Sequence, residues 1–224
     1  VSASGDTLYI GGVNYIIVPG ISLANNAPLT DIDGNVYDTV HIGTQIWMKS
    51  NLKTTKYNDG TDIPNVTNEG TWSALNIGAR SYYNNDSISY AMIYGALYNW
   101  YAVNTGKLCP IGWHVPTDIE WTTLTDYFGG DNVSGGKLKS TSYWNSPNTG
   151  ASDEFGFNAL PGGLRLTNVG FMGIWSDGIF WTSTLEGPPF PPPAWRRSFR
   201  DDEIFVERGQ SLLSDGFSIR CIKD

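Results

Sequence analysis

Turn-forming residues interrupt this chain so often that long regular elements have little room. Glycine accounts for 26 of the 224 residues, about 12% against a usual value of about 7%. Together with asparagine, serine and threonine it forms short clusters between short apolar runs, which is typical of short strands joined by many turns. Two segments with helical spacing stand out from this background. The pattern predicts an α+β fold with two helices and many loops, and it argues against a helical bundle.

The first helical segment is residues 94–104, where aromatic side chains recur every three or four positions. The following Thr105 and Gly106 are typical of a helix end. Such a row of aromatic residues is far more often part of a core than a cofactor site. We therefore expect a helix that buries an aromatic face.

The second helical segment begins at Thr117, which with Glu120 has the spacing of a capping box. Trp121, Leu124 and Phe128 mark its buried face, and two glycines follow. Asp118 and Glu120 could be proposed as paired catalytic carboxylates. Capping and favourable interaction with the helix dipole explain both acids, so we expect them to be structural.

Strands account for most of the remaining chain. Residues 1–30 are interpreted as an N-terminal extension with a small hairpin near Gly11 and Gly12, and residues 36–48 as a second hairpin. Short strands or loops are expected at 135–140, 156–163, 180–184, 195–200 and 217–221. The proline-rich residues 186–193 cannot form a central strand, because proline lacks the N–H group that a ladder requires. We expect an exposed, stiff loop there.

Charge and hydropathy limit the partners. Acidic residues outnumber basic ones by 22 to 14, which gives a net charge of −8. This balance disfavours nucleic acid and anionic membrane surfaces as partners. No apolar run approaches the roughly 20 residues that a transmembrane helix needs. We expect no transmembrane segment.

Signals for an enzyme are weak. The only two histidines are His41 and His114, and both are interpreted as structural. The sequence contains no nucleotide-binding, zinc-protease or serine-hydrolase motif. Asp31, Asp33 and Gly34 are interpreted as a turn, because the other ligands of a calcium-binding loop are absent. We expect no catalytic residues and no cofactor; calcium is compatible with the composition, but no motif indicates it.

The two cysteines, Cys109 and Cys221, are too few for a four-cysteine zinc site. If they pair, they close a loop of more than a hundred residues and imply an oxidising compartment. The alternative is a pair of buried thiols that never meet. The residues alone leave both alternatives open.

Aromatic residues in the later loops are the remaining functional signal. Sugars present a face of C–H groups ringed by hydroxyls, so proteins that bind them combine flat aromatic rings with nearby polar groups. Packing in the core or in turns is the alternative explanation of such residues. The ligand-binding candidates are Trp175, Asp177, Glu186, Phe190 and Trp195, with Asp201 and Asp202 beside them.

Several motifs together resemble a known family. They are residues 43–52 (GTQIWMKSNL), 94–102 (YGALYNWYA), 109–121 (CPIGWHVPTDIEW), 136–140 (GKLKS), 156–163 (GFNALPGG), 181–183 (WTS) and 218–221 (SIRC). In this order they closely resemble the Fibrobacter succinogenes major paralogous domain, over about residues 31–224. Residues 109–121 are also similar to a segment of formylglycine-generating-enzyme-like domains.

The resemblance implies a C-type-lectin-like fold with short, mainly antiparallel strands, and a disulfide between Cys109 and Cys221. It implies a secreted or surface-anchored bacterial protein, commonly a lipoprotein of the Bacteroidetes with a lipid anchor upstream. The motifs of calcium-dependent sugar binding are missing. We expect a non-enzymatic module that recognises a glycan or a surface protein in adhesion. The alternatives are a formylglycine-generating-like or hydrolytic enzyme, which predicts a free thiol, and a structural domain of a fimbria-like assembly.

Overall fold

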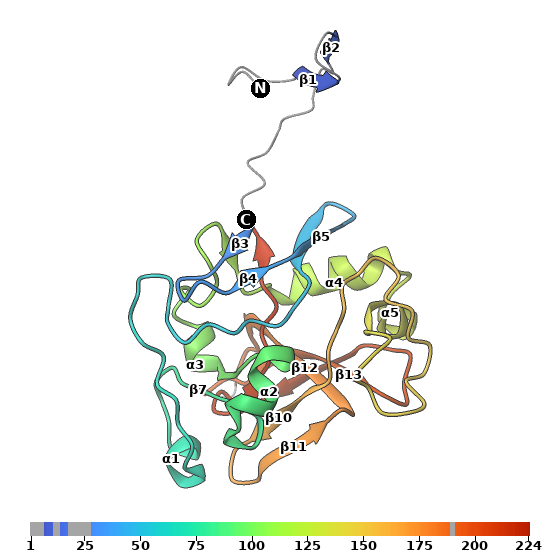
Figure 1. Cartoon of the computed structure of the whole chain (residues 1–224). Helices are drawn as coiled ribbons and strands as arrows, with labels where there is room; N and C mark the ends of the chain where they lie inside the picture. The colour runs from blue at the N-terminus through green and yellow to red at the C-terminus, as the bar shows by residue number, and fades with distance from the viewer. Residues whose placement is uncertain (1–6, 11–13, 18–27, 189–190) are drawn as a thin grey trace.

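The computed structural model describes residues 7–10, 14–17, 28–188 and 191–224 (Figure 1). Its helices are α1 (Glu69–Ser73), α2 (Ser87–Tyr94), α3 (Trp100–Val103), α4 (Asp118–Tyr127) and α5 (Asp131–Leu138). Its strands are β1 (Thr7–Ile10), β2 (Asn14–Ile17), β3 (Leu29–Thr30), β4 (Val36–Tyr37), β5 (Thr39–Ile42), β6 (Gln45–Met48), β7 (Arg80–Ser81), β8 (Leu97–Asn99), β9 (Trp113–His114), β10 (Gly162–Leu166), β11 (Gly170–Ile174), β12 (Asp177–Leu185), β13 (Ala194–Arg200), β14 (Glu207–Ser211), β15 (Gly216–Phe217) and β16 (Ile222–Lys223). The predicted α+β class is confirmed, but the described residues contain five α-helices where two were predicted.

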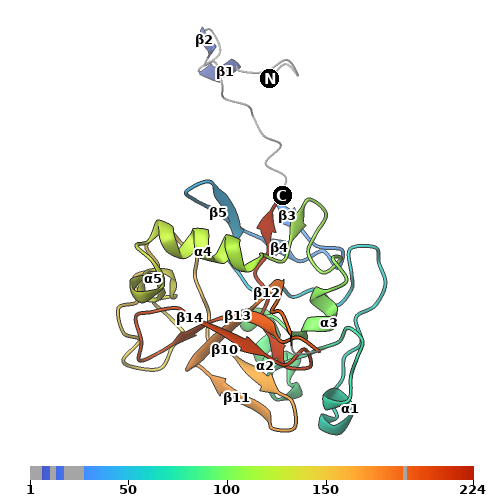
Figure 2. The same cartoon turned by 180° about the vertical axis from the view of Figure 1, so that it is seen from behind.

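Two sheets organise the structure. The larger has the order β14-β13-β12-β10-β15-β8-β7, with β11 paired to β10. The smaller has the order β5-β6-β16-β9. Pairing between the named strands is antiparallel except between β10 and β12. Figure 2 draws β10, β11, β13 and β14 together, with α4 above them and α5 to their left.

An aromatic cluster joins α4 to both sheets. Trp121 of α4 lies 5.1 Å from Trp47 of β6, 5.8 Å from Phe157 and 5.6 Å from Phe180 of β12, measured between ring centroids. All four side chains are fully buried. Offset and edge-on aromatic pairs of this kind add to the free energy gained by burial alone. The cluster explains why the helix crosses this face of the larger sheet.

The helix α4 begins as its sequence predicts. The Thr117 hydroxyl accepts a hydrogen bond from the Glu120 amide, and the Glu120 carboxylate accepts one from the Thr117 amide. Asp118 has a further structural role. Its carboxylate lies 2.7 Å from the buried Arg197 guanidinium of β13 and 2.8 Å from that of Arg208 of β14. These ion pairs fasten the start of α4 to the sheet.

The single helix predicted for residues 94–104 is wrong. Helix α2 ends at Tyr94, Leu97–Asn99 form strand β8 between β15 and β7, and α3 begins at Trp100. Gly95 has φ of +75°, and a Cβ atom there would lie 2.5 Å from the Leu52 carbonyl oxygen. A left-handed residue ends the helix, and the ladder hydrogen bonds of the sheet then outweigh the helical spacing of the aromatic residues.

The strand or loop expected at residues 135–140 is also wrong over most of its length, because Asp131–Leu138 form helix α5. Gly135 and Gly136 lie inside this helix, where glycine is intrinsically unfavourable. Close packing requires them there. A Cβ atom on Gly135 would lie 2.4 Å from the Phe205 carbonyl oxygen, and one on Gly136 would lie 2.5 Å from that of Gly150.

Other predictions of local structure hold. The hairpin at residues 36–48 is present as β5 and β6, and the strands at 180–184 and 195–200 lie within β12 and β13. The segment 217–221 is strand only at its start. The Asp31 turn is confirmed, because its carbonyl accepts from Gly34 and its carboxylate accepts from Asn35. Strands β1 and β2 pair antiparallel, whereas the residues near Gly11 and Gly12 lie outside the described part.

Candidate functional site

Trp175 occupies the tight connection between β11 and β12. Its backbone has φ of +66°, a left-handed conformation that is uncommon for a bulky residue. Two hydrogen bonds hold it there: the Trp175 amide donates to Pro161, and its carbonyl accepts from the Asn145 amide at 2.8 Å. The Trp175 side chain is 45% exposed. Backbone strain of this kind costs about 1–3 kcal/mol and is concentrated at functional sites.

Tyr143 also combines a left-handed backbone with an exposed side chain. It lies in the loop after α5, its φ is +73°, and its side chain is 52% exposed. The next residue, Trp144, points inward and donates from Nε1 to the Ala159 carbonyl at 3.0 Å. This inward anchor fixes the loop that presents Tyr143 to solvent.

Tyr94, at the end of α2, connects these two residues. Its ring lies 6.1 Å from that of Tyr143, edge to face. Burial raises the pKa of Tyr94, and a hydrogen bond with the Trp175 side chain partly opposes that shift. We call Trp175, Tyr143 and the supporting Tyr94 the aromatic platform. Beside it, the exposed Asn145 donates from its side chain to the Ser176 hydroxyl at 3.0 Å.

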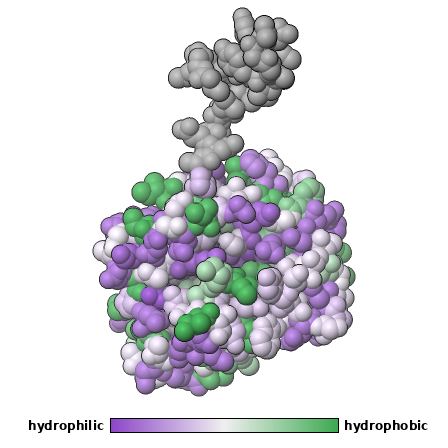
Figure 3. Space-filling model, viewed as in Figure 1, coloured by the Kyte–Doolittle hydropathy of each residue, from purple (hydrophilic) through white to green (hydrophobic). Residues whose placement is uncertain are grey.

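Helix α2 also carries exposed apolar surface, on a face other than that of Tyr94. Helix α2, which supplies Tyr94, also exposes Ile88 and Met92, two positions spaced to share one helix face. In Figure 3, drawn in the view of Figure 1, green apolar groups lie at the front where Figure 1 draws α2.

Asp177 is close to Trp175 in sequence but faces another part of the structure. It lines a pocket of about 260 Å³ with Leu164 of β10 and Met172 of β11, which pair across the two strands. The neighbouring pair, Arg165 and Phe171, points to the opposite face of these strands, because side chains alternate along a strand. On that opposite face Phe171 contacts Tyr83, whose ring packs on Tyr90 of α2. The structure therefore separates Asp177 from the aromatic platform.

Trp195 and Glu186 lie at the other end of the sheet. Asp177 begins β12 and Leu185 ends it, and nine extended residues span up to roughly 27 Å. The Arg208 guanidinium covers the Trp195 ring, 3.5 Å from its centroid. The Glu186 amide donates to Pro193 at 2.8 Å, which closes the predicted proline-rich loop.

The remaining ligand-binding candidates are Phe190, Asp201 and Asp202. Phe190 lies outside the described residues. Asp201 and Asp202 form the turn after β13. In this turn the carbonyl groups of Arg200, Asp201 and Glu203 all accept hydrogen bonds from the buried Lys139 ammonium.

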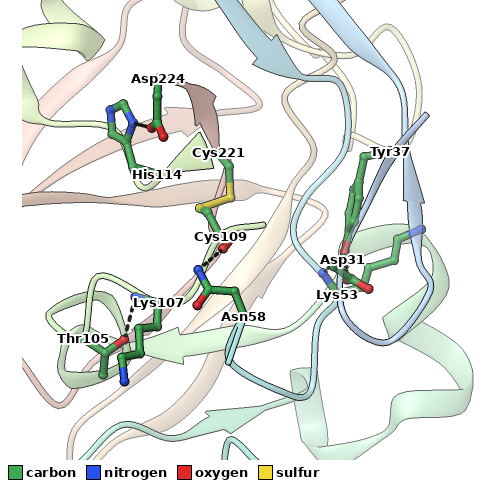
Figure 4. The surroundings of a disulfide bond; sticks show 10 residues. All are labelled: Asp31, Tyr37, Lys53, Asn58, Thr105, Lys107, Cys109, His114, Cys221 and Asp224. Carbon is green, nitrogen blue, oxygen red and sulfur yellow. Dashed lines mark hydrogen bonds and ion pairs between the residues drawn. A yellow bond between two sulfur atoms is a disulfide. The ribbon is translucent and has the colours of Figure 1, made fainter. Parts of the chain in front are cut away.

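The predicted disulfide between Cys109 and Cys221 is present, with an S–S length of 2.06 Å (Figure 4). Both cysteines are buried, and the Asn58 side chain donates to the Cys109 carbonyl at 3.0 Å. These are the only cysteines of the chain. Neither is therefore available as the free thiol that the formylglycine-generating-like alternative requires.

His114 lies near the disulfide and is held by two carboxylates. Its Nδ1 is 2.6 Å from Asp224, and its Nε2 is 2.9 Å from Glu120 (Figure 4 draws the Asp224 contact). Burial alone would lower the pKa of His114, but the hydrogen bonds to Asp224 and Glu120 raise it. Because Glu120 is also part of the capping box, this histidine ties β9 to the start of α4, as a structural interpretation requires.

Metal and membrane sites were considered next. Among the described residues, no group of three or more His, Cys, Asp or Glu side chains is placed to hold a metal ion. In the same part of the chain, no helix is long and apolar enough to cross a membrane.

Comparison with known proteins identifies the family. The model of the Fibrobacter succinogenes major domain matches residues 40–223, and the chain belongs to this family. It matches no curated protein and no solved structure.

The predicted ligand-binding residues therefore fall into three separate places. Trp175 belongs to the aromatic platform, Asp177 to the pocket, and Glu186 and Trp195 to the far end of β12. Tyr143 was not predicted as a site residue. No local signal marks its left-handed backbone, although its position in a Ser- and Asn-rich segment next to Trp144 is typical of an aromatic residue in a loop.

Proposed function

We propose that this chain is a non-enzymatic recognition module that binds a glycan on the aromatic platform. The observation that carries the proposal is the pair of exposed aromatic residues, Trp175 and Tyr143, each held in a strained left-handed backbone. Strain that the fold maintains at two adjacent exposed aromatics favours a binding role over a packing role, because packing would bury them.

The chemistry of the surface fits a sugar. Flat aromatic rings can stack on the C–H face of a pyranose, and the rigid Tyr and Trp side chains lose little conformational entropy on binding. The Asn145 amide supplies polar groups at the margin for the hydroxyls that ring that face. Tyr94 supports the platform from below, so the rings are in place before a ligand arrives.

A cell-surface location and a C-type-lectin-like fold are part of the same proposal. The disulfide supports an oxidising compartment, since such bonds are rare in the cytosol of most organisms. The family, the α+β class and a disulfide that ties the last strand to the segment before α4 support the C-type-lectin-like fold. A lipid anchor upstream of residue 1, with residues 1–30 as a connection, would place the platform outside the cell.

The test is a glycan array probed with the wild-type protein and with Trp175→Ala and Tyr143→Ala variants. Truncation of a central aromatic contact typically costs about 2 kcal/mol or more, so we expect each variant to lose at least about ten-fold in affinity for the glycans bound. Tyr127→Ala is the matched control, because Tyr127 is an equally exposed aromatic residue, 52% exposed, on α4.

Two results would contradict the proposal. A wild-type protein that binds no glycan of host, plant or bacterial origin would remove the ligand class. A glycan that the Trp175→Ala variant binds as well as wild type does would remove the platform as its site. Capture of a surface protein that is lost in both platform variants would instead assign the platform to a protein ligand.

A further inference from the structure

The Asp177 pocket lies on the face of the larger sheet that α4 leaves uncovered. On β12, Asp177 and Ile179 point into this pocket, whereas Phe180 points to the opposite face and packs against Trp121 of α4. The pocket of about 260 Å³ has one apolar wall and one charged wall. The apolar wall consists of Leu164, Leu166, Met172, Ile179 and Phe217.

The Asp177 carboxylate is short of hydrogen-bond donors. Its side chain is 25% exposed, and the nearest cation, the Arg200 guanidinium, is 3.7 Å away. Within the described residues it accepts no hydrogen bond. Gly173 makes the space that the carboxylate occupies, because a Cβ atom there would lie 2.2 Å from Asp177 Oδ2. Because the described residues donate no hydrogen bond to it, the Asp177 carboxylate keeps its acceptor capacity for a ligand that enters the pocket.

The two arginines of the pocket differ in the contacts that they make with other side chains of the protein. Arg196 is committed to the protein: it donates to the Ser211 hydroxyl at 3.1 Å and to the Ser198 hydroxyl, and lies 3.4 Å from Glu207. Arg200 has a side chain that is 55% exposed, so it can turn into solvent when a ligand takes its place beside Asp177. Displacing Arg200 breaks only the long contact to Asp177.

The surrounding charge is negative. An adjoining hollow shares Ser198, Arg200 and Glu207 with the pocket and adds Glu203. Glu203 Oε2 is buried and has no hydrogen-bond partner in the described part of the chain. Burial raises the pKa of Asp177, and the nearby Asp201 and Asp202 raise it further. Carboxylates therefore outnumber the cations around the pocket, which are Arg196, Arg200 and the Lys139 ammonium bound to the neighbouring turn, in agreement with the net charge of −8, and a further cation is attracted.

We propose that the Asp177 pocket binds a primary ammonium group carried on a short aliphatic chain. The ammonium has three N–H donors and no acceptor, which matches the Asp177 carboxylate, to which the described residues donate no hydrogen bond, and the acidic rim. The aliphatic chain lies along the apolar wall, where burial of its methylene groups contributes to binding. A lysine side chain of a partner and a free aliphatic diamine share this chemistry. The site is separate from the aromatic platform, so the two ligands bind independently.

The first test compares amines with neutral molecules of the same shape, by isothermal titration calorimetry on the wild-type protein. The probes are cadaverine and Nα-acetyl-lysine amide, with 1,5-pentanediol and Nα-acetyl-norleucine amide as their uncharged counterparts. We expect the amines to bind at least about ten-fold more tightly than the neutral molecules, and to weaken as salt is added. Tighter binding of the lysine amide assigns the site to a lysine side chain, and tighter binding of cadaverine assigns it to a free diamine.

The second test uses variants. Asp177→Asn keeps the shape but removes the charge, and it should weaken amine binding at least about ten-fold, or about 1.4 kcal/mol. Glu154→Gln is the matched control, because Glu154 is an exposed carboxylate whose nearest cation, Lys137, is similarly distant at 3.9 Å. Trp175→Ala should leave amine binding unchanged.

Three results would overturn the proposal: no binding of either amine, equal binding of amines and neutral counterparts, or undiminished binding by Asp177→Asn. If Asp177→Asn does not fold, the comparison on the wild-type protein decides. Failure of the glycan array leaves these outcomes unaffected, because the platform variants and the pocket variants probe different faces.

Discussion

Breaking the Cys109–Cys221 disulfide should destabilise the protein by several kcal/mol. The bond spans a sequence separation of 112 residues, and for a loop of that size the chain-entropy model gives about 4.8 kcal/mol at room temperature. Removing native disulfides from small secreted domains costs about 2–5 kcal/mol. Because a domain is usually stable by only about 5–15 kcal/mol, we expect a large fraction of the total to be lost.

Urea unfolding of the Cys109→Ala/Cys221→Ala double variant, followed by tryptophan fluorescence, measures this loss. Oxidised and reduced wild-type protein are the control, because that comparison keeps both sulfur atoms and changes only the cross-link. The reduced unfolded chain is less compact, so the dependence of the unfolding free energy on urea should also steepen. A loss below about 1 kcal/mol, with an unchanged urea dependence, would refute an effect on the unfolded chain.

Three further predictions concern single positions. Gly95→Ala should lower the free energy of unfolding by more than about 2 kcal/mol. Gly106→Ala is the control and should lower it by only about 1 kcal/mol, because Gly106 has a similar φ of +66° but open space around it. Equal losses in chemical denaturation would contradict the close approach of Gly95 to Leu52. Burial lowers the pKa of Lys139 to about 8 in the folded protein. Above that pH the unfolded state therefore binds more protons than the folded state, and the free energy of unfolding should rise between about pH 8 and 10.5. The Lys139→Met variant should show no such rise. The raised pKa of His114 contributes stability that is present below about pH 6.5 and is lost as the pH rises through the pKa of His114 in the folded protein. The melting temperatures of wild type and His114→Gln should therefore converge at alkaline pH. Melting temperatures that stay parallel across the pH range would show that the charge of His114 does not affect stability.

Local signals allowed prediction of some elements and concealed others. The start of α4 could be predicted because a capping box is complete within four residues. The helix expected at 94–104 failed because nothing in its aromatic spacing shows that Gly95 must pass the Leu52 carbonyl. Helix α5 was missed because Gly135 and Gly136 lower its helical propensity, and only contacts with distant residues explain them.

In the candidate site, too, local signals predicted some residues and missed others. Trp175 could be selected as an aromatic residue in a turn, and it lies on the aromatic platform. Its partner Tyr143 is 32 positions earlier in the sequence, and the Tyr94 ring of α2 packs on it. Asp177 was selected together with Trp175, but the alternation of a strand places it on the opposite face. Sequence reasoning identified residue types suited to binding, whereas their assembly into separate surfaces depends on long-range strand pairing.

The position of β16 has a consequence for how the protein must be made. This strand is formed by residues 222 and 223, yet it pairs with β6 on one side and β9 on the other. During synthesis the smaller sheet stays open at its centre until residues 222 and 223 leave the ribosome. Such pairing between distant parts of a chain is slow and leaves apolar surface uncovered meanwhile. The domain is therefore expected to complete its fold only after residues 222 and 223 have been made, so its smaller sheet cannot form while the preceding segments emerge.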